Sequence, residues 1–421
     1  MKDNTLYLNL TCFLLLALLP NLMVTILSQG SRTPGFLAAA IVVSLPLLRY
    51  VKFVKIPIEW VAVLIFIFSW ILFVVPIVGR VAYPLKPILS LFLVSFFLIF
   101  VFFIEVWLER CDSYRLYCLV KIIYGVFFII GWFNYFFDIN LLGYRNDNVF
   151  PFPEPAPFAR IAGPIYVATF FLVSKKFKLI ILANALLQAI LLQSLSLLLY
   201  SVIIFIIVLQ VRVIRFLIPI VFIISIVAMF LIKNPIYSKH FTSRFTLSSQ
   251  SGNLTSLVYL QGVVAARDSL VNTDGLGLGF QMLGTEKPNE VSKIISSIVS
   301  DGGEVCRPEG GFLAAKLIAE LGLVGVILTG FVFVRILRSL IWLRRYWRFA
   351  LCSKANWSNY KLKLVIVNSL IVTFFIEMFL RGGEYFSLTV ILFIVSVVYI
   401  RKYNKYYNAI NESNFKYEQC S

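Results

Sequence analysis

The chain has 421 residues and a formal net charge of +18, and 60% of its residues are hydrophobic while only 14% are charged. Soluble proteins contain roughly 45–50% apolar and about 25% charged residues, so this composition excludes an ordinary soluble enzyme. A positive net charge can indicate a nucleic-acid partner. It does not do so when the basic residues are gathered in short loops on one face of a membrane.

Apolar segments of membrane-spanning length recur along the whole chain. A helix of about 20 apolar residues crosses a bilayer. The long runs of Phe, Leu, Ile and Val lack the alternation that an outer-membrane β-barrel requires. We therefore predict an all-α polytopic membrane protein with about 12 transmembrane helices. The predicted spans are 7–27, 35–48, 57–78, 87–106, 119–137, 162–174, 179–193, 195–211, 214–232, 312–334, 362–380 and 385–400.

The break at Gln193-Ser194-Leu195-Ser196 leaves two interpretations open. The short apolar segments on either side form either a tight hairpin or one long broken helix.

Most of the basic residues lie in segments on one predicted face of the membrane. With an even number of spans and the N-terminus inside, the inner segments hold 24 of the 38 basic residues. This predicts that both termini are cytoplasmic and explains the net charge without a nucleic-acid partner. Cys306 is then the only outer cysteine, so the outer side has no intrachain disulfide.

The chain is predicted to form a single integral membrane domain, 1–421, with two large outer loops at 138–161 and 233–311. Long loops are where function concentrates. In the first loop, four prolines between positions 151 and 157 favour a stiff, extended path that holds Glu154 and Arg160 near the next span. The alternative is a rigid surface loop without a functional role.

The second loop carries apolar residues at helical spacing over 254–271 and 290–299, which predicts two short amphipathic helices. Between them, Gly275, Gly277 and Gly279 alternate with leucines. Such glycines allow the backbone to approach a ligand and offer amide donors to a phosphate. An ordinary flexible turn is the alternative, and no Gly-Lys-Ser/Thr follows to make a nucleotide P-loop.

Charged residues gather next to the outer loops and at the outer ends of two late spans. Charges at membrane depth usually face protein or a water-filled cavity. Two pairs, Lys316 with Glu320 and Glu377 with Arg381, lie four residues apart, so each pair can also neutralise itself on one helix face. Arginine is suited to diphosphate oxygens because its planar fork binds two oxygens at once and stays charged. The candidate residues are Glu154, Arg160, Arg267, Arg307, Glu309, Glu377, Arg381 and Glu384.

The single histidine, His240, lies just beyond a predicted span and is interpreted mainly as an interfacial surface residue. One histidine cannot form a His-cluster metal site. We therefore expect no metal and no cofactor, and charge stabilisation by the arginines instead.

The arrangement resembles the bacterial O-antigen polymerases of the Wzy type and, more distantly, the O-antigen ligases. The likeness covers the whole predicted topology and three local patterns. These are Glu154-Pro155 with Phe158-Ala159-Arg160, Glu320-Leu321-Gly322-Leu323-Val324-Gly325, and Leu380-Arg381-Gly382-Gly383-Glu384-Tyr385-Phe386-Ser387. Ligases carry a histidine where this chain has Arg307-Pro308-Glu309, which favours a polymerase.

The resemblance implies a GT-C-like glycosyltransferase of the bacterial inner membrane, active at the periplasmic face. The growing glycan would pass from undecaprenyl diphosphate to the nonreducing end of a new lipid-linked repeat unit, with a chain-length regulator protein as partner. Arg160, Arg267 and Arg381 are then expected to bind the diphosphate and Arg307 to bind it more weakly. Glu309 or Glu154 is expected to act as base or to orient a sugar; His240, Glu377 and Glu384 are further candidates.

Two alternatives remain: an O-antigen ligase, or a transporter that flips a lipid-linked oligosaccharide. A transporter is expected to have short outer loops and polar residues along a central path. In this chain the spans are mostly apolar and the polar residues are gathered outside them.

Overall fold

The computed structural model describes residues 4–27, 32–51, 61–63, 65, 66, 68–70, 74, 85–137, 149–208, 254–298, 306–352, 359–382 and 384–403. Within these residues every regular element is a helix, and the only strand-like pairing is an isolated bridge between Val149 and Phe152. The prediction of an all-α protein is therefore confirmed.

Most helices coincide with predicted apolar segments, and one of them, Leu313–Cys352, continues past its predicted end at 334. The extended path predicted for 151–157 is wrong from Pro155 onwards, because a helix begins there and proline fits the first turn of a helix. The helices are α1 (Asn4–Leu27), α2 (Thr33–Val51), α4 (Leu85–Arg110), α5 (Ser113–Phe137), α6 (Pro155–Leu172), α7 (Lys175–Leu191), α8 (Leu195–Val208), α11 (Leu254–Asn272), α12 (Glu290–Ile298), α13 (Cys306–Glu309), α14 (Leu313–Cys352), α15 (Asn359–Phe379) and a last helix over 388–403.

Six of the described helices are long and apolar enough to cross a bilayer, which identifies a helical membrane protein. They contain Thr5–Ile26, Thr33–Tyr50, Leu89–Arg110, Ser113–Phe136, Leu313–Arg348 and Lys361–Phe379. The total of about 12 spans stays a prediction. Span 214–232 and most of span 57–78 lie outside the described residues.

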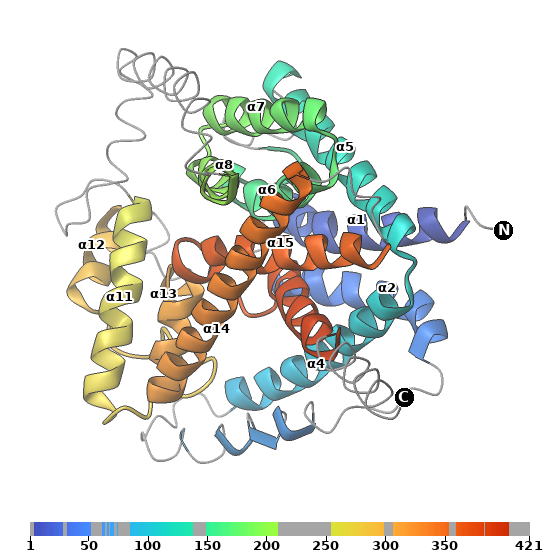
Figure 1. The fold of residues 1–421 in the computed structure, drawn as a ribbon. Coiled ribbons are helices and arrows are strands. Elements are labelled where there is room, and N and C mark those ends of the chain that lie inside the picture. The colour runs from blue at the N-terminus through green and yellow to red at the C-terminus, as the bar shows by residue number, and fades with distance from the viewer. Residues whose placement is uncertain are drawn as a thin grey trace, which may run out of the picture.

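Helix α15 runs through the middle of the molecule (Figure 1). It contacts α5, α6, α8 and α14. Helices α1, α2 and α4 form one side of the bundle, α5 to α8 form another, and α11 to α13 lie beside α14. Almost every side chain of α6 is buried, and Gly163 leaves room for the Tyr200 ring of α8, which a methyl group would contact at 2.0 Å. Small residues thus allow these membrane helices to pack closely.

The break near Gln193 is a tight hairpin. Helix α7 ends at Leu191, Gln193 adopts a left-handed conformation with φ of 50°, and the Ser194 amide donates to the Ala189 carbonyl. Helix α8 then begins at Leu195 and packs back against α7. Of the two interpretations left open by the sequence, the hairpin is confirmed.

Helices α11 and α12 lie where two short helices were predicted. Helix α11 is packed on two sides. Its Leu257 meets Val291 and Ile295 of α12. Another side, with Gly262 and Ser269, lies against the start of α14, where the Ser269 hydroxyl donates to the Ala319 carbonyl at 2.6 Å. The apolar residues predicted on this helix, Leu257, Leu260 and Val264, thus pack in one cluster with α12, and the small and polar residues of α11 face α14.

Candidate functional site

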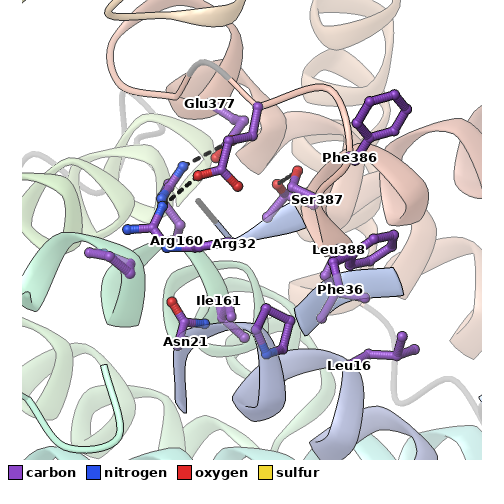
Figure 2. Close-up of a pocket in the computed structure, with 14 residues that line it drawn as sticks. Leu16, Asn21, Arg32, Phe36, Arg160, Ile161, Glu377, Phe386, Ser387 and Leu388 are labelled. Carbon is purple, nitrogen blue, oxygen red and sulfur yellow. Dashed lines mark hydrogen bonds and ion pairs between the residues drawn. The ribbon is translucent and has the colours of Figure 1, made fainter. Parts of the chain in front are cut away.

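A pocket lies where α1, the start of α2, α6, the end of α15 and the start of the last helix meet (Figure 2). It holds about 430 Å³ of space not occupied by atoms, its open mouth included. One part of the wall is charged and polar, and the rest is mostly apolar, as in many sites for organic ligands. The wall consists of Leu16, Pro20, Asn21, Arg32, Phe36, Pro157, Arg160, Ile161, Glu377, Glu384, Phe386, Ser387, Leu388 and Thr389.

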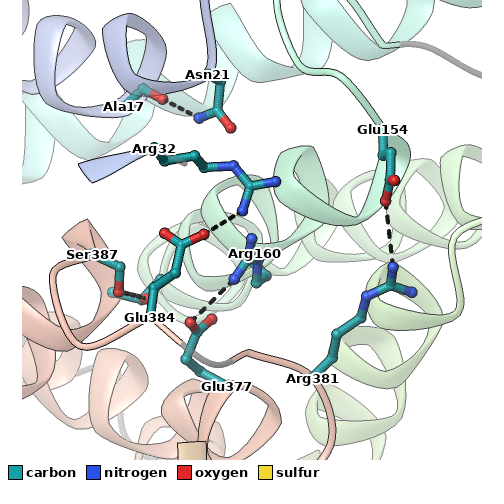
Figure 3. A network of polar contacts seen from close by, with 10 residues as sticks. Ala17, Asn21, Arg32, Glu154, Arg160, Glu377, Arg381, Glu384 and Ser387 are labelled. Carbon is teal, nitrogen blue, oxygen red and sulfur yellow. Dashed lines mark hydrogen bonds and ion pairs between the residues drawn. The ribbon is translucent and has the colours of Figure 1, made fainter. Parts of the chain in front are cut away.

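Two arginine–glutamate pairs form the charged part of the wall (Figure 3). Arg32 Nη1 lies 2.7 Å from Glu384 Oε1, and Arg160 Nη1 lies 3.3 Å from Glu377 Oε1. The Glu377 side chain is only 1% exposed, and that of Arg160 is 13% exposed. A buried carboxylate without a counter-ion costs several kcal/mol, so the nearby guanidinium is needed for Glu377 to stay charged.

The turn after α15 brings Glu384 next to Glu377. Helix α15 ends at Phe379, and the amides of Leu380 and Arg381 both donate to the Ile376 carbonyl. The chain then folds back over the end of the helix. A methyl group at Gly382 would lie 2.6 Å from the Glu377 carboxyl carbon, so only glycine fits this turn.

The charged pairs predicted along single helix faces are not formed. Because α15 ends at Phe379, Arg381 does not continue the face that carries Glu377. Arg381 instead reaches Glu154, with Nη2 3.5 Å from Oε2, and Glu377 pairs with Arg160. The structure therefore joins the end of α15 to the first predicted loop by two ion pairs rather than leaving each pair neutral within one helix.

Lys316 and Glu320 also bind other groups. Glu320 accepts hydrogen bonds from the Gln281 amide at 2.8 Å and from the Tyr385 hydroxyl at 2.9 Å. The Lys316 ammonium lies 4.9 Å from the centre of the Tyr385 ring. This second network lies beside the pocket and fixes Tyr385, which directly follows Glu384.

Glu309 is a carboxylate on which the charges of Arg32 and Arg160 act without an ion pair to either. It ends the short helix α13, and its side chain makes no hydrogen bond or ion pair with any described residue. Burial raises its pKa above the usual range, and the charge of Glu384 raises it further, while Arg32, Arg160 and Lys316 act to lower it. The Gly382 amide donates to the Gly311 carbonyl at 3.3 Å, which joins the segment after Glu309 to the turn after α15.

Two of the predicted arginines are not part of this cluster. The Arg307 guanidinium donates to the backbone carbonyl of Glu286, within its own loop. Arg267 is exposed on α11, and neither residue lines the pocket. His240 lies outside the described residues.

The glycine-rich segment serves the protein's own backbone. Gly275, Gly277 and Gly279 all have positive φ, and the chain here fills a break in α14 at Gly322. The Gly279 amide donates to the Glu320 carbonyl, and the Leu323 amide donates to the Gly275 carbonyl. The Gly277 amide donates to the Thr273 hydroxyl at 2.7 Å. Because these amides already donate hydrogen bonds within the protein, the phosphate-binding interpretation is wrong. The glycines allow this segment to pack closely against α14.

Sequence reasoning missed Asn21 and Arg32. Arg32 lies in the short connection between the predicted spans 7–27 and 35–48, and a connection of that length gives no functional signal. Asn21 had a usable signal, because a polar side chain near the end of an apolar span usually faces protein or a cavity.

In the described part of the chain, no three His, Cys, Asp or Glu side chains are grouped as metal ligands would be. Comparison with family models, curated proteins and solved structures finds no match for this chain.

Proposed function

We propose that this protein is a surface-polysaccharide polymerase of the O-antigen type. It transfers the growing glycan from undecaprenyl diphosphate to the nonreducing end of a new lipid-linked repeat unit. The observation that carries the proposal is the pair of arginines, Arg32 and Arg160, on one pocket at the end of a helical membrane bundle. Guanidinium groups bind diphosphate oxygens with two parallel hydrogen bonds.

The reaction needs charge stabilisation and one proton acceptor. The acceptor hydroxyl oxygen attacks the anomeric carbon of the donor glycan, and the bond from that carbon to the diphosphate oxygen breaks. The electron pair leaves with undecaprenyl diphosphate, where arginines stabilise the negative charge as it develops. A carboxylate takes the hydroxyl proton.

Glu309 suits the role of base better than Glu154. Glu309 is close enough to Arg32 and Arg160 for their charges to act on its pKa, and it has no ion-pair partner among the described residues. Glu154 is 61% exposed and pairs with Arg381. A carboxylate without an ion-pair partner is free to accept a proton from a substrate.

The existing ion pairs set how a diphosphate would bind. Its oxygens would replace Glu384 on Arg32, because that pair is partly exposed and opens to the pocket. Arg160 is held more firmly by the buried Glu377. Arg381, at the edge of the cluster, would add a third guanidinium group.

On this proposal the pocket faces the periplasm of a bacterial inner membrane, in a GT-C-like arrangement of about 12 spans. The physiological partners are lipid-linked oligosaccharides and a chain-length regulator protein.

The test is polymerisation by the purified protein in vesicles that contain only lipid-linked repeat units. We expect polymer from the natural protein and a loss of about 100-fold in rate for Arg32→Ala, the size seen when one donor to a developing charge is removed. Arg267→Ala, an exposed arginine outside the pocket, is the matched control and should retain the rate.

The other outcomes separate the alternatives. Transfer of a glycan to lipid A-core and no polymer would identify a ligase. Passage of the lipid-linked repeat across the vesicle membrane without any transfer would identify a transporter. Equal rates in Arg32→Ala and Arg267→Ala would show that the pocket is not the site of the reaction.

A further inference from the structure

Three buried polar atoms at the pocket have no hydrogen-bond partner in the described structure. They are Asn21 Oδ1, Glu377 Oε2 and Arg32 Nε. Asn21 is 4% exposed and Glu377 is 1% exposed, so bulk water does not satisfy their oxygens. Buried polar groups in folded proteins are nearly always hydrogen-bonded, and the exceptions call for an explanation such as a ligand.

The orientation of Asn21 is fixed by its own helix. Its Nδ2 donates to the Ala17 carbonyl one turn earlier, at 3.0 Å. This bond uses the amide nitrogen and leaves Oδ1 on the side that faces Arg32 (Figure 3). Glu377 is arranged in a similar way, since Oε1 binds Arg160 and Oε2 is left without a partner.

The chemistry of these atoms does not match a diphosphate alone. Two of the three are acceptors, and an ionised diphosphate has only acceptor oxygens to offer them. A sugar ring carries hydroxyl groups, each of which donates one hydrogen bond and accepts others. It can therefore donate to Asn21 Oδ1 and Glu377 Oε2 while it accepts from Arg32 Nε. The apolar side chains of Pro20, Phe36 and Phe386 line the same pocket and suit the C–H faces of a ring.

We infer that this pocket binds a sugar ring of the lipid-linked substrate, with Asn21 as a positioning residue that accepts a hydrogen bond from a sugar hydroxyl. The inference rests on the proposed function and adds a subsite to it. The diphosphate binds beside this ring, on the Nη1 atom that Arg32 now shares with Glu384, while the ring accepts from Arg32 Nε, so that Arg32 serves both groups.

The experiment compares the binding of two lipids to purified full-length protein. One is undecaprenyl diphosphate, and the other is the pool of lipid-linked oligosaccharides extracted from the source cells. Asn21→Leu keeps the approximate size of the side chain but removes the acceptor. We expect its affinity for the sugar-carrying lipids to fall by about 3- to 10-fold, the value of one hydrogen bond. Its affinity for undecaprenyl diphosphate should not change.

Asn368→Leu is the matched control. Asn368 is also 4% exposed, and its Nδ2 also donates to a carbonyl four residues earlier, that of Leu364, but it does not line the pocket. This variant should bind both lipids as the natural protein does. The unchanged binding of undecaprenyl diphosphate, together with an unchanged thermal midpoint, shows that Asn21→Leu is folded.

Two results would overturn the inference. If Asn21→Leu binds the sugar-carrying lipids with natural affinity, or loses affinity equally for both lipids, Asn21 does not contact a sugar, whatever the polymerisation assay shows. If the natural protein does not bind sugar-carrying lipids at all, the proposed function fails, and this subsite fails with it.

Discussion

At the scale of single residues, the two arginine–glutamate pairs at the pocket and the pair at its edge differ in what they hold together. Arg160 and Glu377 are almost fully buried and come from different helices, so their pairing fixes α6 against α15. Arg381 and Glu154 are 32% and 61% exposed, and exposed pairs contribute about 1 kcal/mol or less. The buried pair therefore helps to hold the two helices together, while the Arg381 pair contributes little to stability.

Glu309 gives a prediction about pH. In the proposed mechanism its active form is the carboxylate, and burial and the charge of Glu384 raise its pKa. A raised pKa means that the side chain takes up a proton at a higher pH than an ordinary glutamate does. When pH is lowered, we therefore expect the polymerisation rate to begin to fall at a pH above the usual range of glutamate pKa values. Glu309→Gln should lower the rate about 100- to 10,000-fold at neutral pH and remove this pH dependence.

Glu154→Gln is the comparison for Glu309→Gln, since both variants keep the side-chain shape. Polymerisation rates are measured across pH at matched amounts of folded protein. Glu154→Gln should keep most of the rate and the same pH profile, because its partner Arg381 is partly exposed to solvent. A normal rate and profile in Glu309→Gln would remove Glu309 as the base.

At the scale of elements, the break in α14 is the least regular feature of the bundle. Gly322 has φ of 59° and ψ of −133°, and the helix continues on both sides of it. The glycine-rich segment supplies the hydrogen bonds that the break leaves open, and Glu320 just before the break binds Tyr385. This connects the second predicted loop to the turn that carries Arg381 and Glu384, so the shape of the site depends on the break.

Gly322→Ala should destabilise the protein. The added methyl group would lie 1.9 Å from the Gly275 carbonyl oxygen, and alanine is strained at positive φ. We expect a loss of at least about 2 kcal/mol, seen as a lower thermal midpoint of the purified protein in detergent.

Gly330→Ala is the control within the same helix. A methyl group at Gly330 would meet no atom within 4 Å, and alanine favours helix over glycine by about 1 kcal/mol. This variant should keep or raise the midpoint. Equal midpoints for the two variants would mean that the glycine-rich segment does not pack into the break.

The sequence predicted elements better than it predicted contacts between them. Long apolar runs locate helices because length and composition alone decide whether a segment can cross a bilayer. The partners of Arg160 and Arg381 depended on where α15 ends, which the pattern around 377–384 did not reveal. The role of Gly277 was equally hidden, because a glycine needed for packing and one needed for phosphate look alike in a sequence.

At the scale of the whole molecule, one set of polar contacts joins distant segments near one end of the bundle. At this end, Lys402 lies 2.9 Å from Glu109, and Lys363 donates to the Glu109 carbonyl at 3.2 Å. Arg115 donates to Thr5 at the same end. These residues belong to segments predicted to be inner or, for Lys363, to the inner end of a predicted span. The pocket joins segments predicted to be outer, so the described contacts agree with the predicted alternation of sides.

This division leads to a prediction about labelling in intact cells. In a variant whose six native cysteines are replaced, one cysteine is introduced at Lys287, exposed in the second predicted loop, or at Arg401, exposed on the last helix. A membrane-impermeant thiol reagent should label Lys287→Cys in cells whose outer membrane has been made permeable. It should label Arg401→Cys only after the inner membrane is opened, because the excess of inner lysine and arginine sets the orientation. Labelling of both cysteines from the same side would contradict the topology. Labelling with the sides reversed would place the arginine pocket in the cytoplasm, where a periplasmic polymerase cannot use it.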